Sequence, residues 1–330
     1  ASFIELTNPS PFMYGIGGAR ISAQDGYTVR MDPDGSVVAL TGITEQGQGT
    51  EAIMAQIVAE AVGVSPQMVR IVTGDTRVTP FGGGTWASRG AGIGGEAALQ
   101  AGRAVRGQAL EVAASMLQAK AGDLDIRDGI VVDAATGEER MALSEVGRVV
   151  YFRGDTLPKG LPRELMQTRH FITSNYPYAF TNGVQASYVE VDVETGFVKL
   201  LKHWCVEDCG RIINPLLVDE QIRGGIVQGI GAALFEEICY DGEGQILNGT
   251  MADYLVPMSG EMPDMIIRHV ETPTEESELG AKGAGEAGTA GAPAAVMNAI
   301  NDAIRPLGGA VTHMPFTPER ILRALGTITD

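Results

Sequence analysis

Cysteine and histidine are scarce in this chain, which limits the metal and disulfide sites it can build. Its 330 residues include three cysteines and four histidines. An odd cysteine count in a long chain favours a reducing compartment over a disulfide scaffold, so we expect a cytoplasmic protein. Cys205 and Cys209 are too far apart for a C-x-x-C pair, and the histidines are scattered singly. The sequence therefore predicts no side-chain metal site and no histidine-based catalytic triad.

Positive charge and long apolar runs are also in short supply. Lys and Arg number 24 against 41 Asp and Glu, for a formal net charge of −17. This balance argues against a nucleic-acid-binding surface, so an anionic ligand must meet backbone N–H groups or a few placed arginines. No apolar run is long enough to span a bilayer, and the N-terminus lacks the features of a signal peptide. We expect neither nucleic acid nor membrane among the partners.

Glycine, in contrast, is abundant, and many of its 44 copies lie in loops next to predicted helices. Four such loops carry polar residues, which are Gln48, Ser88, Arg89, Gln228 and Glu286. One glycine loop is weak support for a site, because glycine is common at helix ends for structural reasons. Four of them indicate convergence on one large anionic ligand. The isolated carboxylate of Glu286 is a candidate general base.

The loop around Glu286 has two other interpretations. Gly283-Ala-Gly285-Glu-Ala-Gly288 fits the G-x-G-x-x-G dinucleotide fingerprint, and a purely structural glycine loop is also open. A dinucleotide loop should follow a buried strand, whereas residues 272–278 are polar and acidic. We place Pro293 in the first turn of a helix that continues over 294–304.

The predicted elements alternate between hairpins and helices, which indicates an α+β fold with mixed sheets. Strands are expected at 27–31, 37–40, 69–73, 184–193, 197–201 and 265–270. Helices are expected at 50–62, 96–119, 143–149, 215–237 and 294–304. We predict a first subdomain at 1–170, with a peripheral excursion at about 122–170, and a second at 171–330. The repeated order of hairpin and helix in both halves indicates an internal duplication.

Six short blocks of glycine and polar residues follow one another along the chain. They are Thr44-Glu-x-Gly47-Gln48-Gly49, Thr85-Trp-Ala87-Ser88 with Gly95-Glu-Ala, Val189-Glu-Val-Asp-x-x-Thr195-Gly196, Asp208-Cys-Gly-Arg-x-x-Asn214-Pro215, Gly225-x-x-Gln228-Gly-x-Gly231 and Lys282-Gly-x-Gly285-Glu286. In this order they resemble the C-terminal half of the molybdenum-cofactor subunit of the xanthine dehydrogenase and aldehyde oxidase family. The blocks cover residues 27–305. The resemblance implies the family's molybdopterin-binding fold, with hairpin-helix repeats.

Individual residues acquire roles through this resemblance. Gly47 and Gln48 would hydrogen-bond the pterin or its dithiolene, and Gln228 would hold the pterin on another side. Ala87, Ser88, Arg89 and Gly90 would line the cofactor, although Arg89 is equally open to a surface role. Gly285 would leave room beside Glu286, which matches the family's catalytic carboxylate. No side chain would ligate the molybdenum, because the dithiolene holds it.

Activity and partners are implied in the same way. The family's enzymes oxidise an aldehyde or an N-heteroaromatic carbon with oxygen derived from water, and their cofactor is molybdopterin, as such or as its cytosine dinucleotide. Electrons would leave toward 2Fe-2S clusters and FAD on partner subunits. The family's subunit is longer than this chain, so a partner should supply its N-terminal half, either as a split subunit or as a missing domain. The alternative is a non-catalytic cofactor-binding or assembly relative, which would have no need of Glu286.

Overall fold

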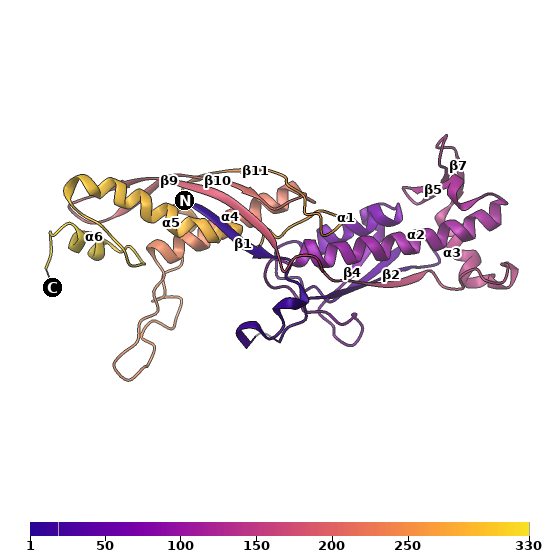
Figure 1. The fold of residues 1–330 in the computed structure, drawn as a ribbon, viewed down its shortest axis with the longest axis horizontal. Helices are drawn as coiled ribbons and strands as arrows, with labels where there is room; N and C mark the ends of the chain where they lie inside the picture. The colour runs from indigo at the N-terminus through magenta and orange to yellow at the C-terminus, as the bar shows by residue number, and fades with distance from the viewer. Residues whose placement is uncertain (19, 330) are drawn as a thin grey trace. The chain divides into compact units, whose positions relative to one another are not determined.

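The computed structural model describes residues 1–18 and 20–329, which form two compact units. Unit 1 comprises Ala1–Leu6, Phe180–Thr272 and Gly283–Asp330, and unit 2 comprises Thr7–Ala179 and Pro273–Lys282. The main passage between the units therefore lies at 179/180, while the subdomain division at 170/171 stays a prediction. Figure 1 shows helices and sheets in each unit, and the predicted α+β class is confirmed.

Unit 2 is built on a four-stranded sheet in the order β4-β3-β2-β8. Its elements are β2 (Asp25–Met31), β3 (Val37–Thr41), α1 (Thr50–Val62), β4 (Val69–Val72), α2 (Gly95–Leu117) and β8 (Met166–Phe171). The predicted hairpin of β2 and β3 is confirmed, and its turn places Gly35 at a φ of +86°. Helix α1 then connects β3 to β4, and β4 pairs parallel to β3. On the other side of the hairpin, β8 pairs antiparallel to β2.

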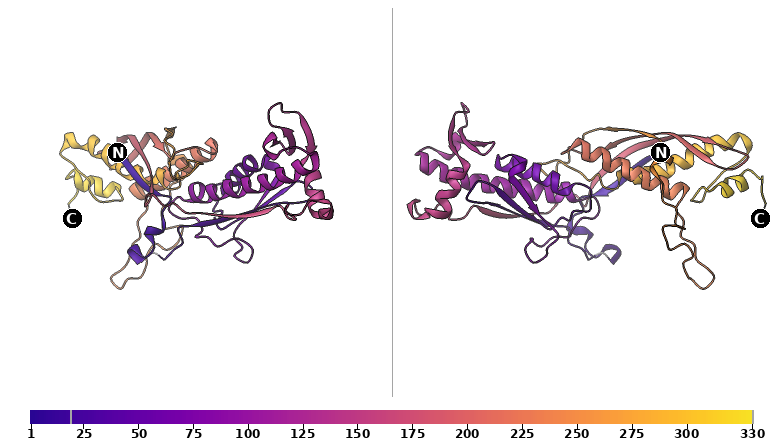
Figure 2. Two further views of the ribbon diagram at one scale, coloured as in Figure 1. Left: turned by 45° about the vertical axis from the view of Figure 1, so that its right-hand side comes forward. Right: turned by 180° about the vertical axis from the view of Figure 1, so that it is seen from behind.

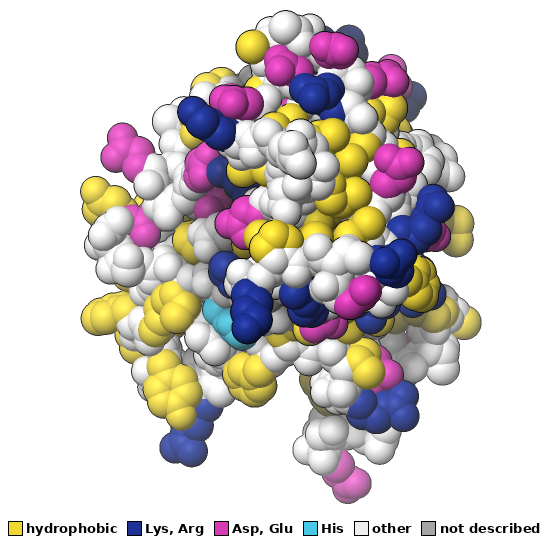
Figure 3. Space-filling view, turned by 90° about the vertical axis from the view of Figure 1, so that its right-hand side faces the viewer, with side chains coloured by type: hydrophobic (Ala, Val, Ile, Leu, Met, Phe, Trp, Pro, Cys, Tyr) yellow, Lys and Arg dark blue, Asp and Glu magenta, His cyan; other side chains and the backbone are white. Residues whose placement is uncertain are grey.

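The segment 122–170 forms a small satellite of unit 2. It contains a three-stranded sheet and a helix, namely β5 (Leu124–Arg127), β6 (Ile130–Asp133), β7 (Glu139–Ala142) and α3 (Leu143–Phe152). The hairpin predicted at Asp128-Gly129 is confirmed between β5 and β6. Figure 3 faces the end of unit 2 that carries these elements, where acidic and basic side chains surround exposed apolar ones. A mixed surface of this kind is typical of a solvated face.

Unit 1 repeats the topology of unit 2. Its elements are β1 (Ser2–Thr7), β9 (Ala179–Val191), β10 (Val198–Asp208), α4 (Pro215–Leu234), β11 (Asp264–His269), α5 (Ala287–Ile304) and α6 (Pro318–Ala324). A hairpin of β9 and β10 is followed by a crossover helix, α4, and by β11, which pairs parallel to β10. The strand order is β1-β9-β10-β11. The two units share the order hairpin, helix, parallel strand, helix, so the predicted repeat of hairpin and helix is present in both, while the internal duplication stays a prediction.

In each unit the two long helices cover one face of the sheet, as the views of Figures 1 and 2 show. The core of unit 1 forms where isoleucines recur at helical spacing on α4 and α5, at 222, 226, 230, 300 and 304. Strand β1 alternates exposed and buried residues, as expected of a strand with one covered face. No helix in the described part of the chain is long and apolar enough to cross a membrane.

Helix α5 corrects one prediction. The helix begins at Ala287, so Pro293 lies inside it and is not part of its first turn. Proline lacks the N–H that would bond to residue i−4, which is why the sequence suggested a later start. Packing compensates for this loss, because Gly229 of α4 is small enough for Ala292 and Pro293 to approach it closely. Glu286 is therefore the residue that immediately precedes the helix.

Candidate functional site

The carboxylate of Glu45 binds the backbone of the first glycine loop of unit 2. Its carboxylate accepts hydrogen bonds from the backbone N–H groups of Gln46 at 3.0 Å, Gly47 at 2.7 Å, Gly49 at 3.2 Å and Glu51 at 2.9 Å. Burial opposes ionisation, but these four bonds hold the pKa of Glu45 below its ordinary value. The Glu45 carboxylate thus already supplies the negative charge that is favourable at the N-terminus of α1. These four N–H groups are therefore already hydrogen-bonded within the chain.

Gln48 also serves the loop in which it lies. Its Oε1 accepts from the N–H of Gln46 at 2.6 Å, and its Nε2 donates to Thr50 Oγ1 at 2.9 Å. Gly47 has a φ of +92°, and a Cβ there would meet no atom within 4 Å. Glycine is therefore required by the backbone conformation, and the peptide at Gly47 borders open space that a ligand could enter.

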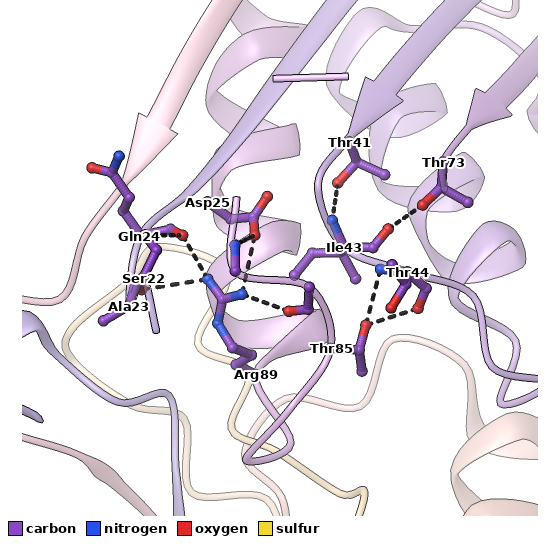
Figure 4. A network of polar contacts seen from close by, with 12 residues as sticks. Ser22, Ala23, Gln24, Asp25, Thr41, Ile43, Thr44, Thr73, Thr85 and Arg89 are labelled. Atoms are coloured by element: carbon purple, nitrogen blue, oxygen red, sulfur yellow. Dashed lines mark hydrogen bonds and ion pairs between the residues drawn. The ribbon is translucent and has the colours of Figure 1, made fainter. Parts of the chain in front are cut away.

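The second glycine loop is tied to the first by Thr85. Its hydroxyl donates to the carbonyl of Thr44 at 2.7 Å and accepts from the N–H of Thr44 at 3.0 Å (Figure 4). Ala87 and Ser88 follow with φ angles of 45° and 50°. A left-handed conformation costs a residue other than glycine about 1–3 kcal/mol, so the surrounding contacts impose this shape. Gly90 then begins the π-helical turn that leads into α2.

Arg89 is fully buried in this loop. Its guanidinium lies 3.0 Å from the carboxylate of Asp25, and it donates to the carbonyls of Gly84 at 2.6 Å and Gln24 at 2.8 Å (Figure 4). Burial raises the pKa of Asp25, against the lowering effect of Arg89. These contacts tie Arg89 to its own loop at Gly84 and to Gln24 and Asp25 at the start of β2, so they shape the loop. Sequence reasoning missed Asp25, which has no motif around it.

The loop that carries Glu286 is fixed through its carbonyl groups. In unit 1, Thr181 donates to Gly283 O at 2.6 Å, and Gln221 donates to Gly285 O at 2.7 Å. Gln185 donates to Ala287 O at 3.1 Å and to Gly288 O at 2.9 Å. Glu286 itself is exposed, and its side chain does not cap α5. The backbone on both sides of the carboxylate is therefore held by donors from β9 and α4.

A buried chain of hydrogen bonds supports these donors. Gln185 Oε1 lies 3.0 Å from His203 Nε2, and His203 Nδ1 lies 2.9 Å from Ser187 Oγ. Since both Gln185 N–H groups are directed to carbonyls, Gln185 Oε1 must accept from a protonated Nε2 of His203. Burial lowers the pKa of His203 to about 4, so the ring is neutral and its Nδ1 accepts from Ser187. The donor and the acceptor of each hydrogen bond between Gln185, His203 and Ser187 are thus assigned.

Glycines allow α4 and α5 to cross at very short range beside Glu286. A Cβ on Gly288 would lie 2.8 Å from Ile226 N, and one on Gly225 would lie 3.0 Å from the backbone of Gly288. Thr289 Oγ1 donates to Gly225 O at 2.9 Å and lies 3.3 Å from Oε1 of the exposed Gln228. The crossing thus places Gln228 of α4 beside Thr289 of α5, three residues after Glu286.

No sequence motif predicts the side chains that hold the Glu286 loop in place. Thr181, Gln185 and Gln221 lie in no family block. The one available signal was Gln185 itself, because a polar residue at an inward position of an alternating strand needs buried partners.

The dinucleotide interpretation of the Glu286 loop is wrong, because the last strand before it, β11, ends at His269 and leaves a long connection.

The structure fits an organic cofactor better than a metal bound by side chains. No group of three or more His, Cys, Asp or Glu residues in the described ranges could hold a metal ion. In unit 2, a Cβ on Gly47 would meet no atom within 4 Å, and the buried indole N–H of Trp86 has no acceptor in the described structure. Unit 1 offers the exposed amide of Gln228. An indole N–H and an amide are polar groups of the kind that hydrogen-bond an organic ring, whereas neither is a usual metal ligand.

Comparison with known proteins first defines the fold. The quinoline 2-oxidoreductase of Pseudomonas putida 86 superimposes with a TM-score of 0.89 and 39% identity, over 98% of this chain and 41% of that one. A copper- and molybdenum-containing CO dehydrogenase gives a TM-score of 0.87 with 29% identity, over 99% of this chain and 41% of that chain. The fold is that of the molybdopterin-binding subunits of molybdenum hydroxylases.

Sequence comparison then identifies the family. The profile of the molybdopterin cofactor-binding domain matches residues 9–263, and the chain belongs to this family. The nicotine 6-hydroxylase large subunit of Paenarthrobacter nicotinovorans is 39% identical over 99% of this chain and 40% of its own length. The CO dehydrogenase large chain of Hydrogenophaga pseudoflava is 30% identical over 91% of this chain and 37% of its length. The chain thus spans about 40% of the curated relatives it matches, and its predicted membership of the xanthine dehydrogenase family is confirmed.

Proposed function

We propose that this chain is the C-terminal half of the molybdenum-cofactor subunit of a hydroxylase that acts on an N-heteroaromatic carbon with oxygen derived from water. Family membership supports the class of enzyme. Two relatives at 39% identity, nicotine 6-hydroxylase and quinoline 2-oxidoreductase, are named for N-heterocyclic compounds, which favours such a substrate over an aldehyde.

The observation that carries the proposal is the setting of Glu286. Its carboxylate is exposed, while the carbonyls of Gly285 and Ala287 on either side accept hydrogen bonds from Gln221 and Gln185. A base must keep its position relative to the proton that it removes, and a loop fixed in this way supplies that position. Glu286 would accept the proton of the water-derived oxygen as this oxygen is transferred to the substrate carbon.

Several residues would contact the cofactor through backbone or amide groups. Gly47, Ala87, Ser88 and Gly90 would present backbone to the molybdopterin, and Gln48 would hold the shape of its loop while reaching the pterin. Gln228 would donate through its amide, and Gly285 would leave room beside Glu286. Arg89 would position the second loop. When bound, the cofactor supplies the metal centre that receives the electrons from the substrate.

The proposed partners are inferred from the part of the relatives that this chain does not match. The relatives extend well beyond the matched 40% of their length, so a second polypeptide or domain would supply the N-terminal half of the cofactor cradle. Subunits with 2Fe-2S clusters and FAD would carry the electrons away. The cofactor would be molybdopterin or its cytosine dinucleotide.

Replacing Glu286 by Gln in the complete complex tests the base. We expect turnover to fall about 100-fold or more, because general-base catalysis contributes this much, while molybdenum content stays unchanged. Glu278→Gln is the matched control, since Glu278 precedes the same loop but pairs with Arg103 in unit 2. Turnover of Glu286→Gln within a few-fold of the wild type would exclude the base. A loaded complex without turnover on any N-heterocycle or aldehyde would favour the non-catalytic alternative.

A further inference from the structure

The segment between α4 and β11 projects from unit 1 as a long loop, here called the arm and defined as residues 238–258 (Figures 1 and 2). The arm has an ordered backbone. Tyr240 and Ile246 form an antiparallel bridge, and the N–H of Leu247 donates to Cys239 O at 2.8 Å. At the base, the Tyr254 hydroxyl donates to Glu236 at 2.6 Å. The arm therefore has a defined shape in this chain by itself.

The side chains of the arm are unusually apolar for a surface loop. Six large apolar residues are between 53% and 76% exposed, namely Ile238, Tyr240, Leu247, Met251, Leu255 and Met258. Such a concentration on an exposed segment marks an interaction surface. The arm also carries Asp241, Glu243 and Asp253 but no Lys or Arg.

An apolar cavity of about 360 Å³ adjoins the base of the arm. Leu255 and Met258 of the arm line it together with Phe235, Phe316 and Phe197, and Phe197 is 67% exposed. Because three residues, Leu255, Val256 and Met258, belong to both features, the arm and the cavity form one continuous apolar surface.

We propose that this surface docks the part of the molybdenum subunit that the chain lacks, which rests on the function proposed above. The relatives match 99% of this chain with only 40% of their own length, so in them a large remaining part accompanies the same fold. The docked part would present an apolar groove with Lys or Arg opposite Asp241 and Glu243. A second copy of this chain is a poor occupant, because a symmetric contact would bring two acidic arms together.

Cys239 provides a reporter for the test, because it is the exposed thiol of the arm while Cys205 and Cys209 are buried. The chain would be co-expressed with the segment of the nicotine 6-hydroxylase large subunit that lies outside the match. We expect the two to co-purify and maleimide labelling of Cys239 to slow at least about tenfold, as a covered interface requires. The doubly substituted Leu247→Ser, Met251→Ser chain should bind at least about tenfold more weakly, since central apolar side chains carry most interface energy.

Controls separate this proposal from the proposed function. Phe152→Ser removes an apolar side chain that is 68% exposed on α3 and should leave co-purification unchanged. Glu286→Gln should also bind normally, so a failure of the base assignment would leave the docking result intact. Equal binding by the arm variant and the wild type would overturn the proposal. So would a wild-type chain that stays free of the segment, or one that self-associates through the arm.

Discussion

Arg89 Nη1 lies 3.0 Å from Asp25 Oδ2, with both side chains fully buried. Asp25 is the first residue of β2, and Arg89 follows the two left-handed residues of the second glycine loop. The pair therefore fastens a proposed cofactor loop to the sheet of unit 2. The same carboxylate accepts from the N–H of Gly83 at 3.3 Å, so it holds the loop at two places.

Removing the arginine should strongly destabilise unit 2. In Arg89→Met, Asp25 would remain buried without its partner, and a lone buried charge of this kind costs about 3–5 kcal/mol. Urea unfolding measures the loss. Arg77→Met is the control, because Arg77 pairs with Asp75 at the surface at 2.8 Å and its side chain is 86% exposed. Adding Asp25→Asn should restore part of the stability of Arg89→Met. Equal midpoints for the two single variants would contradict a structural role for the buried pair.

Two glycines of unit 1 should respond to alanine in opposite directions. A Cβ on Gly288 would lie 2.8 Å from Ile226 N, so the helices must separate, at a cost of about 1–3 kcal/mol. Turnover should fall as well, because Glu286 immediately precedes the same helix. A Cβ on Gly224 would meet no atom within 4 Å, so Gly224→Ala should stabilise α4 by about 0.5–1 kcal/mol. Thermal unfolding of the two variants measures both effects. Destabilisation by both variants would contradict the close crossing of α4 and α5.

The buried His203 should make unit 1 sensitive to acid. Its pKa of about 4 lies below the ordinary value of 6.5, so between these values the unfolded chain binds a proton that the folded chain refuses. Stability is therefore present above pH 6.5 and decreases toward pH 4, by about 3 kcal/mol from this residue. Urea unfolding of His203→Gln against the wild type across this range should show a flatter profile for the variant.

His269 should affect the pH dependence of stability in the opposite direction to His203. Burial lowers its pKa, but hydrogen bonds to Asp219 and Glu207 raise it above the ordinary value overall. Its contribution is present below the unfolded pKa and is lost as the pH rises through the folded one. A profile of His203→Gln that is parallel to the wild type would show that the buried chain of hydrogen bonds does not depend on a neutral ring.

The two glutamines proposed at the cofactor should behave differently. Gln48 holds the backbone of its loop, so Gln48→Ala should lower both the stability of unit 2 and molybdenum occupancy in the complete complex. Gln228 is exposed, so Gln228→Ala should lower occupancy with little change in the unfolding midpoint. Metal analysis and thermal unfolding separate the two effects, and full occupancy in both variants would contradict their proposed contact with the pterin.

Prediction from sequence succeeded where the deciding interactions are local. The hairpins at Gly35 and Gly196 were recognised because glycine at positive φ and neighbouring Asp residues specify a turn within a few positions. Helix α1 was placed at its observed bounds for the same reason. Strands β1 and β8 were missed, since both pair with strands distant in the sequence. The start of α5 was misplaced because packing on α4 outweighs the local effect of proline.

The order of its sequence blocks by itself determined the family of this protein, its class of fold and the identity of Glu286 as the candidate base. The tertiary structure alone decided what holds that carboxylate in place. Thr181, Gln185 and Gln221 reach its loop from 64 to 103 residues away, and such contacts leave no local pattern. Likewise, Arg89 became a buried structural residue only through Asp25, 64 positions earlier. Short motifs identify residues that a ligand requires at fixed spacing. Burial and long-range hydrogen bonds, in contrast, exist only once the chain has folded.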